Sequence, residues 1–592
     1  MTGFTPPPAF TTRPQLTGTF GMAASTHATA TAVAQAVLER GGTAFDAVVA
    51  GGFVLHIVEP HLNGPGGDLV GLFQAAGGPP TVLAGQGPAP AGATVAHLRA
   101  EGLDLVPGAG GLAAAVPGAV DAWLLLLRDH GTWELADVLA YAIGYARDGH
   151  PLLAAASVTI GRVAGLFRDA WPSSAALWMP DGDVPAPGAV VRNPAYATVL
   201  EGLVAAGRGA ATRAERIDAA RAEWKTGLVA HAAAEFLTRP HRHATGTDHA
   251  AVITAADFAG FDAAYEQPLT APFRGYTVAK AGAWCQGPAL LEALRILEPL
   301  EDAQLDPQTP LGAHTIIETL KLVLADRDAY FGDGVDVTAL LTEEYAAARR
   351  AEIGETASRV WRPGSPGART PFRPPLRVDH ALAAVAGTGE PTVAPTGQTR
   401  GDTCHIDVVD RWGNIVAVTP SGGWLQSSPT IPALGFCLGT RLQMCWLDES
   451  SPAALRPGVR PRTTLSPTLV LQDGETVIAM GTPGGDQQDQ WQLPMLLRML
   501  VGGYSAQAAI DAPTLHTTAL IDSFWPRTWT PAGVVVEDRV GSEVIEGLRA
   551  RGHDVLAAGD WSLGRLSAVG IHGGTVWAAA NPRGMQGYAA GR

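Results

Sequence analysis

The first part of the chain is patterned for helices. Apolar and small residues at helical spacing predict a helix over Ala28–Arg40, ended by the glycine pair that starts at Gly41. A second helix is expected from Thr43, which lies at capping-box spacing from Asp46. Because nearly every later position in it is apolar, this helix should be buried between layers. Further helical patterns follow, the last of them over Thr315–Tyr330.

After residue 400 the pattern changes to strands. Three pairs of strands are expected, with the sequences CHIDVV and NIVAVT, TLVLQ and TVIAMG, and LSAVGI and VWAAA. Amphipathic helices are expected around Gln492–Leu500 and Ser505–Asp511. Strand pairs with helices packed outside them predict an α+β fold, with sheets stacked face to face under helical layers.

Residues 354–400 lie between the two parts. This stretch is rich in Gly, Pro, Thr and Arg and has little apolar periodicity. Such a composition is typical of an extended, exposed linker. It is the clearest boundary in the sequence.

Composition excludes several classes of function. The 592 residues are 46% apolar and carry a formal charge of −15, which argues against disorder and against nucleic-acid binding. No Gly-Lys pair is present, so a P-loop is excluded, and the four cysteines show no CxxC spacing for zinc. With no apolar stretch long enough for a membrane and no signal-like N-terminus, we expect a cytoplasmic protein without membrane partner, metal or cofactor.

The candidate chemistry lies where the strand part begins, in the sequence GDTCHIDVVD. A threonine that opens a strand is usually structural, but Thr403 follows the linker and begins the central hairpin. Downstream, a strand ends in Pro483-Gly484-Gly485, whose successive N–H groups can form an anion cradle. The alternative for these glycines is a simple tight corner.

Together these segments resemble the γ-glutamyltranspeptidase family of N-terminal nucleophile hydrolases, nearly end to end. The resemblance is carried in family order by residues 21–50 and by the sequences PHLNGPGGD, DFAGFDAAYEQPLTAPFRGYTV, ADRDAYFGD, TCHIDVVDRWGN, RPRTTLSPTLVLQDG and GTPGG. It implies a four-layer αββα sandwich, one large domain assembled from a large subunit, 1–402, and a small subunit, 403–592. The chain would cut itself between Asp402 and Thr403.

The resemblance also implies roles for individual residues. Once freed by cleavage, the α-amine of Thr403 would activate its own hydroxyl, which would attack a small-molecule amide. The N–H groups of Gly484 and Gly485 would hold the oxyanion, and Ser421 would orient the amine. For Ser421, a structural strand-end hydroxyl is the equal alternative.

The acyl pocket departs from the family pattern. Gln86 stands where the family has an arginine that grips the substrate carboxylate, and Gly423 replaces an asparagine. An amide supplies neither the charge nor the fork of a guanidinium. Met444 or Cys445 falls where an aspartate would pair with the substrate ammonium, and Asp448 is out of register. The family's serine pair becomes Thr463 and Thr464. We therefore expect an amidohydrolase or acyltransferase that does not prefer a γ-glutamyl group.

Other residues could rebuild this pocket. Trp424 and Trp446 flank the expected acyl site and could line an apolar pocket, or they could be ordinary core residues. Arg441 and Arg462 could bind a carboxylate from another direction. Two rival interpretations stay open: a genuine glutathione hydrolase or γ-glutamyltransferase with a rearranged carboxylate clamp, and an inactive, unprocessed binding protein. The oligomeric state, a homodimer included, is left open as well.

Overall fold

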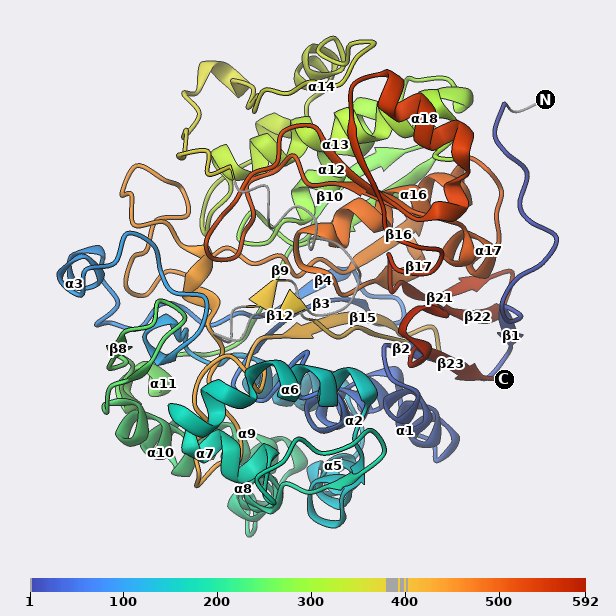
Figure 1. Ribbon diagram of the computed structural model, residues 1–592. Coiled ribbons are helices and arrows are strands. Elements are labelled where there is room, and N and C mark those ends of the chain that lie inside the picture. Colours follow the sequence, from blue (N-terminus) through green and yellow to red (C-terminus); the bar gives the residue numbers. More distant parts are fainter. Residues whose placement is uncertain (1–2, 379–391, 394–398, 401–402) are drawn as a thin grey trace.

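Two seven-stranded sheets form the centre of the computed structural model, which describes residues 3–378, 392–393, 399–400 and 403–592 (Figure 1). The first sheet has the strand order β23 (Tyr588–Gly591), β2 (Gly21–Ser25), β14 (Ile406–Asp410), β15 (Ile415–Ser421), β3 (Asp68–Gln74), β4 (Pro80–Gly85), β9 (Ala264–Glu266). The second has the order β1 (Leu16–Gly18), β22 (Thr575–Ala580), β21 (Ser567–His572), β17 (Glu475–Gly481), β16 (Thr468–Gln472), β11 (Tyr276–Lys280), β10 (Leu269–Phe273). All neighbouring strands within these two sheets are antiparallel.

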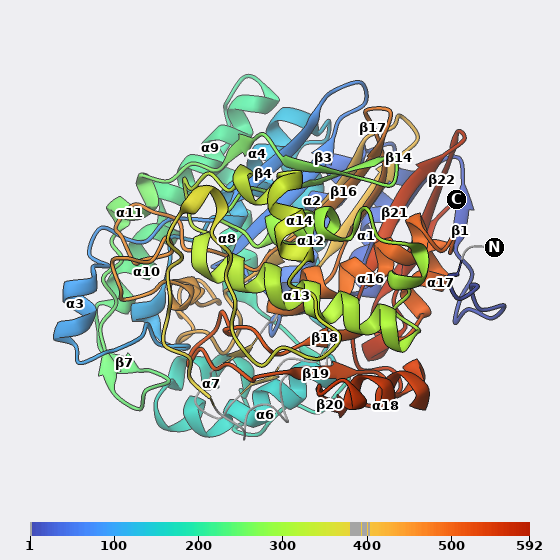
Figure 2. The same cartoon turned by 90° about the horizontal axis from the view of Figure 1, so that it is seen from above.

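Helices cover the outer side of each sheet, as Figure 1 shows. Beside the first sheet pack α1 (Ala28–Glu39), α2 (Ala44–Val58), α4 (Ala119–His130), α5 (Leu135–Asp148), α8 (Pro194–Ala206), α9 (Arg213–Thr226) and α10 (Leu228–Leu237). Beside the second pack α12 (Gly287–Leu297), α13 (Pro310–Tyr330), α14 (Glu343–Arg350), α16 (Gln488–Leu500), α17 (Ala506–Asp511) and α18 (Ser542–Ala550). Seen from above, α12, α13 and α16 lie in front of the strands (Figure 2).

Shorter elements surround this centre. The remaining helices are α3 (Val95–Ala100), α6 (Ala154–Asp169), α7 (Pro172–Trp178) and α11 (Ala255–Ala259). A three-stranded sheet has β18 (Leu515–Thr517), β19 (Gly533–Val536) and β20 (Asp554–Ala557). Strand pairs are formed by β5 (His150–Pro151) and β6 (Val190–Val191), by β7 (His241–Arg242) and β8 (Asp248–His249), and by β12 (Thr392–Val393) and β13 (Thr399–Arg400).

The apolar core divides between the two faces of each sheet. Because successive side chains of a strand point to opposite faces, Ile406 and Val408 of β14 pack with the helices while Val409 packs against the second sheet. In β16, Val470 faces the helices and Leu469 faces the first sheet. The core between the sheets is built largely from small and β-branched residues, which lets the two sheets approach closely.

The mixed helix-and-strand fold and its main elements were correctly predicted. The three expected strand pairs are the antiparallel hairpins β14–β15, β16–β17 and β21–β22. Thr43 and Asp46 form the expected capping box at the start of α2. The helix expected from Thr315 begins earlier, at Pro310, because the Thr309 side chain caps it by accepting a hydrogen bond from the Gly312 N–H.

Residues 354–378, the first part of the expected linker, are mostly exposed, but they are tied to the helical layer of the second sheet. This part has little regular structure, but Trp361 and Pro366 are buried against the helices of the second sheet. Backbone carbonyls tie it down, since Arg349 donates to Arg362 O and Tyr330 to Gly364 O. A segment poor in apolar periodicity is here held by hydrogen bonds that composition does not reveal. Most of the remaining linker lies outside the described residues.

In the described part of the chain, no helix is both long and apolar enough to cross a bilayer.

Candidate active site

Thr403 lies at the start of the central hairpin of the first sheet. It forms a β-bridge with Ser421, the last residue of β15, and its Oγ1 donates a hydrogen bond to Ser421 Oγ at 3.1 Å. Both side chains are almost fully buried. Since β14 pairs with β2 on one side and β15 on the other, the threonine is held in the interior of the sheet. Asp402, on the other side of the expected cleavage bond, lies outside the described residues.

The residues after Thr403 point alternately between the sheets and toward the helices. His405 contacts Thr419 Oγ1 through Nδ1 at 2.8 Å and Asp407 Oδ1 through Nε2 at 2.7 Å. Ser567 of β21 donates to Asp407 Oδ2 at 2.7 Å, which ties the two sheets together. Burial raises the pKa of Asp407, and His405 opposes that effect. This network could not be predicted from the sequence, because it depends on Ser567 of a distant strand.

Cys404 points the opposite way, toward the helices of the first sheet. Its Sγ accepts a hydrogen bond from Asn63 Nδ2 and donates one to Glu59 Oε2, each at 3.0 Å. Burial is the main cause that raises the pKa of the Cys404 thiol. The cysteine belongs to the core between the first sheet and its helices. Such a thiol is inert, which leaves Thr403 as the candidate nucleophile of this strand.

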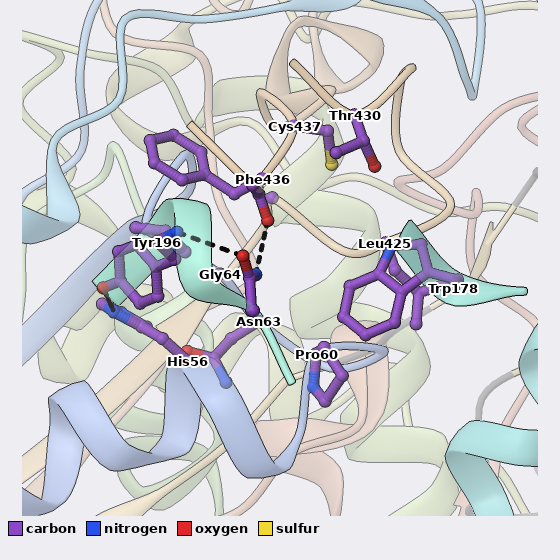
Figure 3. Close-up of a pocket in the computed structure, with 14 residues that line it drawn as sticks. His56, Pro60, Asn63, Gly64, Trp178, Tyr196, Leu425, Thr430, Phe436 and Cys437 are labelled. Carbon is purple, nitrogen blue, oxygen red and sulfur yellow. Dashed lines mark hydrogen bonds between the residues drawn. The ribbon is translucent and has the colours of Figure 1, made fainter. Parts of the chain in front are cut away.

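A pocket lies on this Cys404 side of the sheet. Figure 3 shows Tyr196 and Phe436 on one side of it and Trp178 and Leu425 on the other. His56 Nδ1 is 3.1 Å from the Tyr196 hydroxyl. Asn63 also lines the pocket and donates to Cys404 Sγ, so the pocket adjoins the Cys404 side of the hairpin.

The glycine-rich loop between α2 and β3 supports the hairpin end. A Cβ on Gly67 would collide with Ser421 O, one on Gly64 with Gly423 O, and one on Gly66 with Cys437 O. Only glycine allows the backbone to approach this closely. The loop thereby fixes the backbone from Ser421 to Gly423, beside the Thr403 hydroxyl.

Gly484 and Gly485 follow the end of β17, in the second sheet. Their φ angles are +125° and +56°, and a short 3₁₀ turn, Gly485–Gln487, leads from them into α16. The His405 ring lies directly against Gly481, the last residue of β17. The structure therefore brings the glycine turn and the start of β14 to neighbouring positions in the two sheets.

The glycine turn is clamped from the helical layer. Gln286 Nε2 donates to Gly485 O at 3.2 Å, and Arg327 of α13 donates to Gln286 Oε1 at 3.0 Å. Arg327 also pairs with Asp486, directly after the turn. Arg327 lies in the ADRDAYFGD segment, but the sequence gives no sign of its partner. The N–H groups of the turn are thus set in a rigid frame, as oxyanion donors require.

Arg441 is occupied by a partner that sequence reasoning missed. Its Nε and Nη2 donate to the two carboxylate oxygens of Asp68 at 2.6 and 2.7 Å, and both residues are buried. Burial raises the pKa of Asp68, and the guanidinium opposes that effect. Gln86 lines the same small cavity; its Oε1 has no hydrogen-bond partner among the described residues. The only signal for Asp68 was its place directly after the glycine run.

The two tryptophans lie in different surroundings. Trp424 packs with Met444 and Phe524 and donates to Leu62 O at 2.9 Å, so it stands beside the segment where the family's aspartate was expected. Trp446 belongs to the core of the second sheet, with the Arg527 guanidinium 4.1 Å from its ring centre. Asp448 accepts two hydrogen bonds from Ser450 in an exposed turn.

Thr463 and Thr464 lie on the extended segment before β16. The Thr463 N–H donates to Trp284 O at 2.8 Å. The Thr464 hydroxyl is buried and has no hydrogen-bond partner in the described part of the chain. The preceding residue, Arg462, is also buried and bonds to Ser523 Oγ at 2.8 Å.

Two histidines, His243 and His249, lie at the β7–β8 strand pair. His243 is buried and accepts a hydrogen bond from the Leu112 N–H at 2.9 Å, and buried His249 bonds to Glu101. These contacts give the two rings structural roles, which the polar surroundings in sequence concealed.

One group of the described residues has metal-ligand chemistry: His314, Glu318 and His553, all buried. Their donor atoms are already engaged, because His314 Nδ1 lies 2.9 Å from His553 Nε2 and Lys321 donates to Glu318 at 2.7 Å. Arg362 pairs with the other oxygen of Glu318. A cation would have to displace two positive side chains to bind there, so the arrangement fits a structural network better than a metal centre.

Comparison with known proteins gives consistent matches over the whole chain. The Gamma-glutamyltranspeptidase family model matches residues 30–591. The glutathione hydrolase-like YwrD proenzyme of Bacillus subtilis is 29% identical over 96% of this chain and 98% of its own length. The oxamate amidohydrolase proenzyme of Klebsiella pneumoniae is 29% identical over 97% and 98%.

Two solved structures extend the similarity to the fold. One, of LmbA2991, is 52% identical with a TM-score of 0.94, covering 98% of this chain and 100% of that chain. Another, a cephalosporin acylase from Bacillus halodurans, is 25% identical with a TM-score of 0.81 and covers 98% of each chain.

Proposed function

This chain belongs to the gamma-glutamyltranspeptidase family, and on that premise we propose that it is a self-processing amidohydrolase or acyltransferase whose nucleophile is Thr403. The observation that carries the proposal is the position of the Thr403 hydroxyl, bonded to Ser421 at the start of β14. Several relatives are named as proenzymes, which supports activation by cleavage. We also propose that the two sheets and their helices form the αββα sandwich of N-terminal nucleophile hydrolases, and that the enzyme works in the cytoplasm.

The proposed reaction begins with cleavage of the Asp402–Thr403 bond. An amide nitrogen is not basic, so the uncut chain is inert; the freed α-amine has an ordinary pKa of about 7.7–8.0 and accepts the hydroxyl proton. Thr403 Oγ1 then attacks the substrate carbonyl, and the N–H groups at Gly484 and Gly485 stabilise the negative oxygen. The amine leaves with the proton, and an acyl-threonine ester remains. Water or a second amine then releases the acyl group.

The acyl group of the substrate is proposed to differ from γ-glutamyl. Gln86 and Gly423 replace the arginine and asparagine of the γ-glutamyl pocket, and the Met444 segment supplies no carboxylate there. Each lost charge-assisted contact weakens binding by about 1.5–3 kcal/mol. Named relatives include an oxamate amidohydrolase and a cephalosporin acylase, so other acyl groups occur among similar proteins. The rival is a glutathione hydrolase with a rearranged clamp.

Processing is tested by denaturing electrophoresis of the purified protein, with N-terminal sequencing of the smaller band. We expect that band to begin Thr-Cys-His-Ile and to comprise residues 403–592. Thr403→Ala should leave one full-length, inactive chain. The matched control is Thr81→Ala, on a half-buried position of β4 far from Thr403 in sequence, which should be processed and active. A fully active uncut chain would refute the proposal, and an unaffected T403A protein would favour the binding-protein alternative.

The acyl preference is tested separately with anilides. A γ-glutamyl anilide and simple acyl anilides are compared by kcat/KM on the processed enzyme. We expect the γ-glutamyl compound to be no better than the others. A strong γ-glutamyl preference would support the rearranged clamp instead.

A further inference from the structure

A buried histidine and a buried carboxyl group join the two sheets next to the candidate nucleophile. His405 and Asp407 point to the same side of the first sheet as Thr403, because they follow it at intervals of two residues along the strand. His405 Nε2 lies 2.7 Å from Asp407 Oδ1, and both side chains are fully buried. Polar groups in such a position are costly unless each is bonded, so their other partners indicate why the pair is there.

Each member of the pair contacts the second sheet. Asp407 Oδ2 accepts a hydrogen bond from Ser567 Oγ of β21 at 2.7 Å. The ring of His405 lies against Gly481 of β17, where an added Cβ would be 2.3 Å from the ring Cε1. Gly481 and Ser567 are themselves paired in the second sheet. We call the contact of His405 and Asp407 with Gly481 and Ser567 the intersheet contact.

The second nitrogen of the His405 ring is bonded within the first sheet. His405 Nδ1 lies 2.8 Å from Thr419 Oγ1 of β15. This strand ends at Ser421, whose hydroxyl accepts the hydrogen bond from Thr403. The ring is therefore attached to both strands of the central hairpin. Because both of its nitrogens have partners, the orientation of the ring is fixed.

The intersheet contact is close in the chain to both groups that the proposed reaction uses. Thr403 lies two residues before His405, and Gly484 lies three residues after Gly481. At about 3.3 Å per residue of extended chain, these separations are about 7 and 10 Å. Since the nucleophile and the oxyanion donors belong to opposite sheets, the distance between them depends on how the sheets are held together at this end.

We propose that His405, held by Asp407, is a positioning residue that sets the distance between the Thr403 hydroxyl and the N–H groups of the Gly484–Gly485 turn. The inference rests on the proposed function, because it assigns a role within the same reaction. His405 acts here through the backbones of β14 and β17 and exchanges no proton with the substrate. The attacking oxygen and the oxyanion donors must be held at a fixed separation, and a misplacement of about 1 Å can lower the rate about a hundredfold.

The test separates kcat from KM in variants of the pair. Activity is measured with the anilide that the wild-type enzyme cleaves best, and kcat is calculated per processed chain, quantified by denaturing electrophoresis. Asp407→Ala and His405→Ala should lower kcat by about ten- to a hundredfold and change KM by less than about threefold. Asp407→Asn should retain most of the wild-type kcat, because an amide has the same shape and can bond to both partners.

A double variant tests the contact between the sheets directly. Gly481→Ala adds a methyl group against the His405 ring and should lower kcat when it is the only change. In a His405→Ala background the space of the ring is empty, so Gly481→Ala should cause little further loss. Such coupling means that the two residues act through one contact. Should D407A fail to fold, Ser567→Ala removes a single hydrogen bond of the same contact and should lower kcat by about two- to tenfold.

The matched control is Gln74→Met. Gln74 of β3 also joins the two sheets, because it accepts a hydrogen bond from the Thr476 N–H at 2.6 Å and donates one to Gly474 O at 3.1 Å. Its neighbour in the first sheet is Ile415, at the opposite end of β15 from Ser421. The loss of these hydrogen bonds should lower the melting temperature but leave kcat and KM unchanged.

The outcomes separate this inference from the proposed function. If D407A and S567A are processed and lower only the melting temperature, as the control does, the positioning role is overturned and Thr403 remains the nucleophile. Equal losses of kcat in D407N and D407A also overturn it, since the charge of Asp407 would then matter rather than its contacts. Independent effects of G481A and H405A on kcat would do the same. An uncut, inactive wild-type chain removes the proposed function and the positioning role together.

Discussion

Single glycines help to determine the geometry of the candidate site. Gly484 has a φ of +125°, a conformation that residues with a Cβ rarely adopt, and a Cβ there would collide with the ring of Trp491. Trp491 is itself buried in the core of the second sheet, so its ring is held by packing. The position of the N–H groups at the turn therefore depends on the absence of one methyl group.

Gly484→Ala should lower kcat/KM by at least about a hundredfold, because displacing one oxyanion donor costs about that much. The measurement is kcat/KM on a good anilide substrate, with the processed fraction followed by denaturing electrophoresis. Gly474→Ala is the control: its φ is +88°, but nothing lies within 4 Å of the added methyl group. It should lose about 1 kcal/mol of stability and little activity. Equal losses in the two variants would mean that backbone strain alone explains the effect.

Among single residues, the sequence predicts candidates that belong to a short motif. It does not predict those whose importance depends on a partner far away in the chain. Thr403 and the Gly484–Gly485 turn lie in short motifs, TCHIDVVDRWGN and GTPGG, that resemble those of the family. The Asp68–Arg441 pair joins positions 373 residues apart, and no pattern near either residue points to the other. For the same reason sequence reasoning left Arg441 and Arg462 as equal candidates, although Arg441 forms a bidentate pair with Asp68 and Arg462 bonds to Ser523.

Among the elements, hairpins and capped helices were predicted well because their signals lie within a few residues. The turns of the three hairpins and the capping box of α2 are examples. The contacts that hold residues 354–378 were not predicted, because they are made by side chains of α13 and α14 and leave no pattern in the segment itself. Local signals therefore predict helices and strands, whereas the contacts of an irregular segment depend on packing between elements.

The contact between α12 and α13 contains a buried pair of carboxyl groups. Glu292 of α12 is fully buried beside the carboxyl group of Asp326. Asp326 of α13 is held by Tyr345 at 2.8 Å and Arg349 at 3.0 Å. Burial, and next to it the charge of Asp326, raise the pKa of Glu292 well above its ordinary value.

This pair predicts a pH-dependent stability. Since the pKa of Glu292 is raised in the folded state, unfolding releases a proton above about pH 4.5, and the free energy of unfolding falls as the pH rises toward the folded-state pKa. Glu292→Gln removes the ionisation. Its melting temperature, measured by calorimetry, should equal that of the wild type near pH 4 and exceed it near pH 8.

The control for this comparison is Glu344→Gln, on the exposed face of α14. It should leave the difference between the two pH values unchanged. If E292Q followed the wild type at both pH values, the buried carboxyl would not titrate as described.

In the molecule as a whole, the two expected subunits are interleaved in both sheets. In the first sheet, β14, β15 and β23 come from residues 403–592 and lie among β2, β3, β4 and β9. In the second, β16, β17, β21 and β22 lie between β1 on one side and β10 and β11 on the other. The last residue also contacts the segment before β2, because the backbone of Phe20 donates to Arg592 O at 2.8 Å. Cleavage at Thr403 would therefore cut the chain without dividing the fold.

We accordingly predict that the two pieces stay together after cleavage and cannot fold apart. Separation would break the backbone ladders β2–β14, β3–β15 and β11–β16 and expose the core between the sheets to water. A tag on the N-terminal piece should retain the untagged C-terminal piece through native affinity purification and gel filtration. Under denaturing conditions the two should part. Residues 403–592 expressed alone should be insoluble or unfolded, whereas Thr403→Ala, which stays uncut, should elute as the processed enzyme does. Recovery of a folded, separate piece from native buffer would contradict the interleaved arrangement.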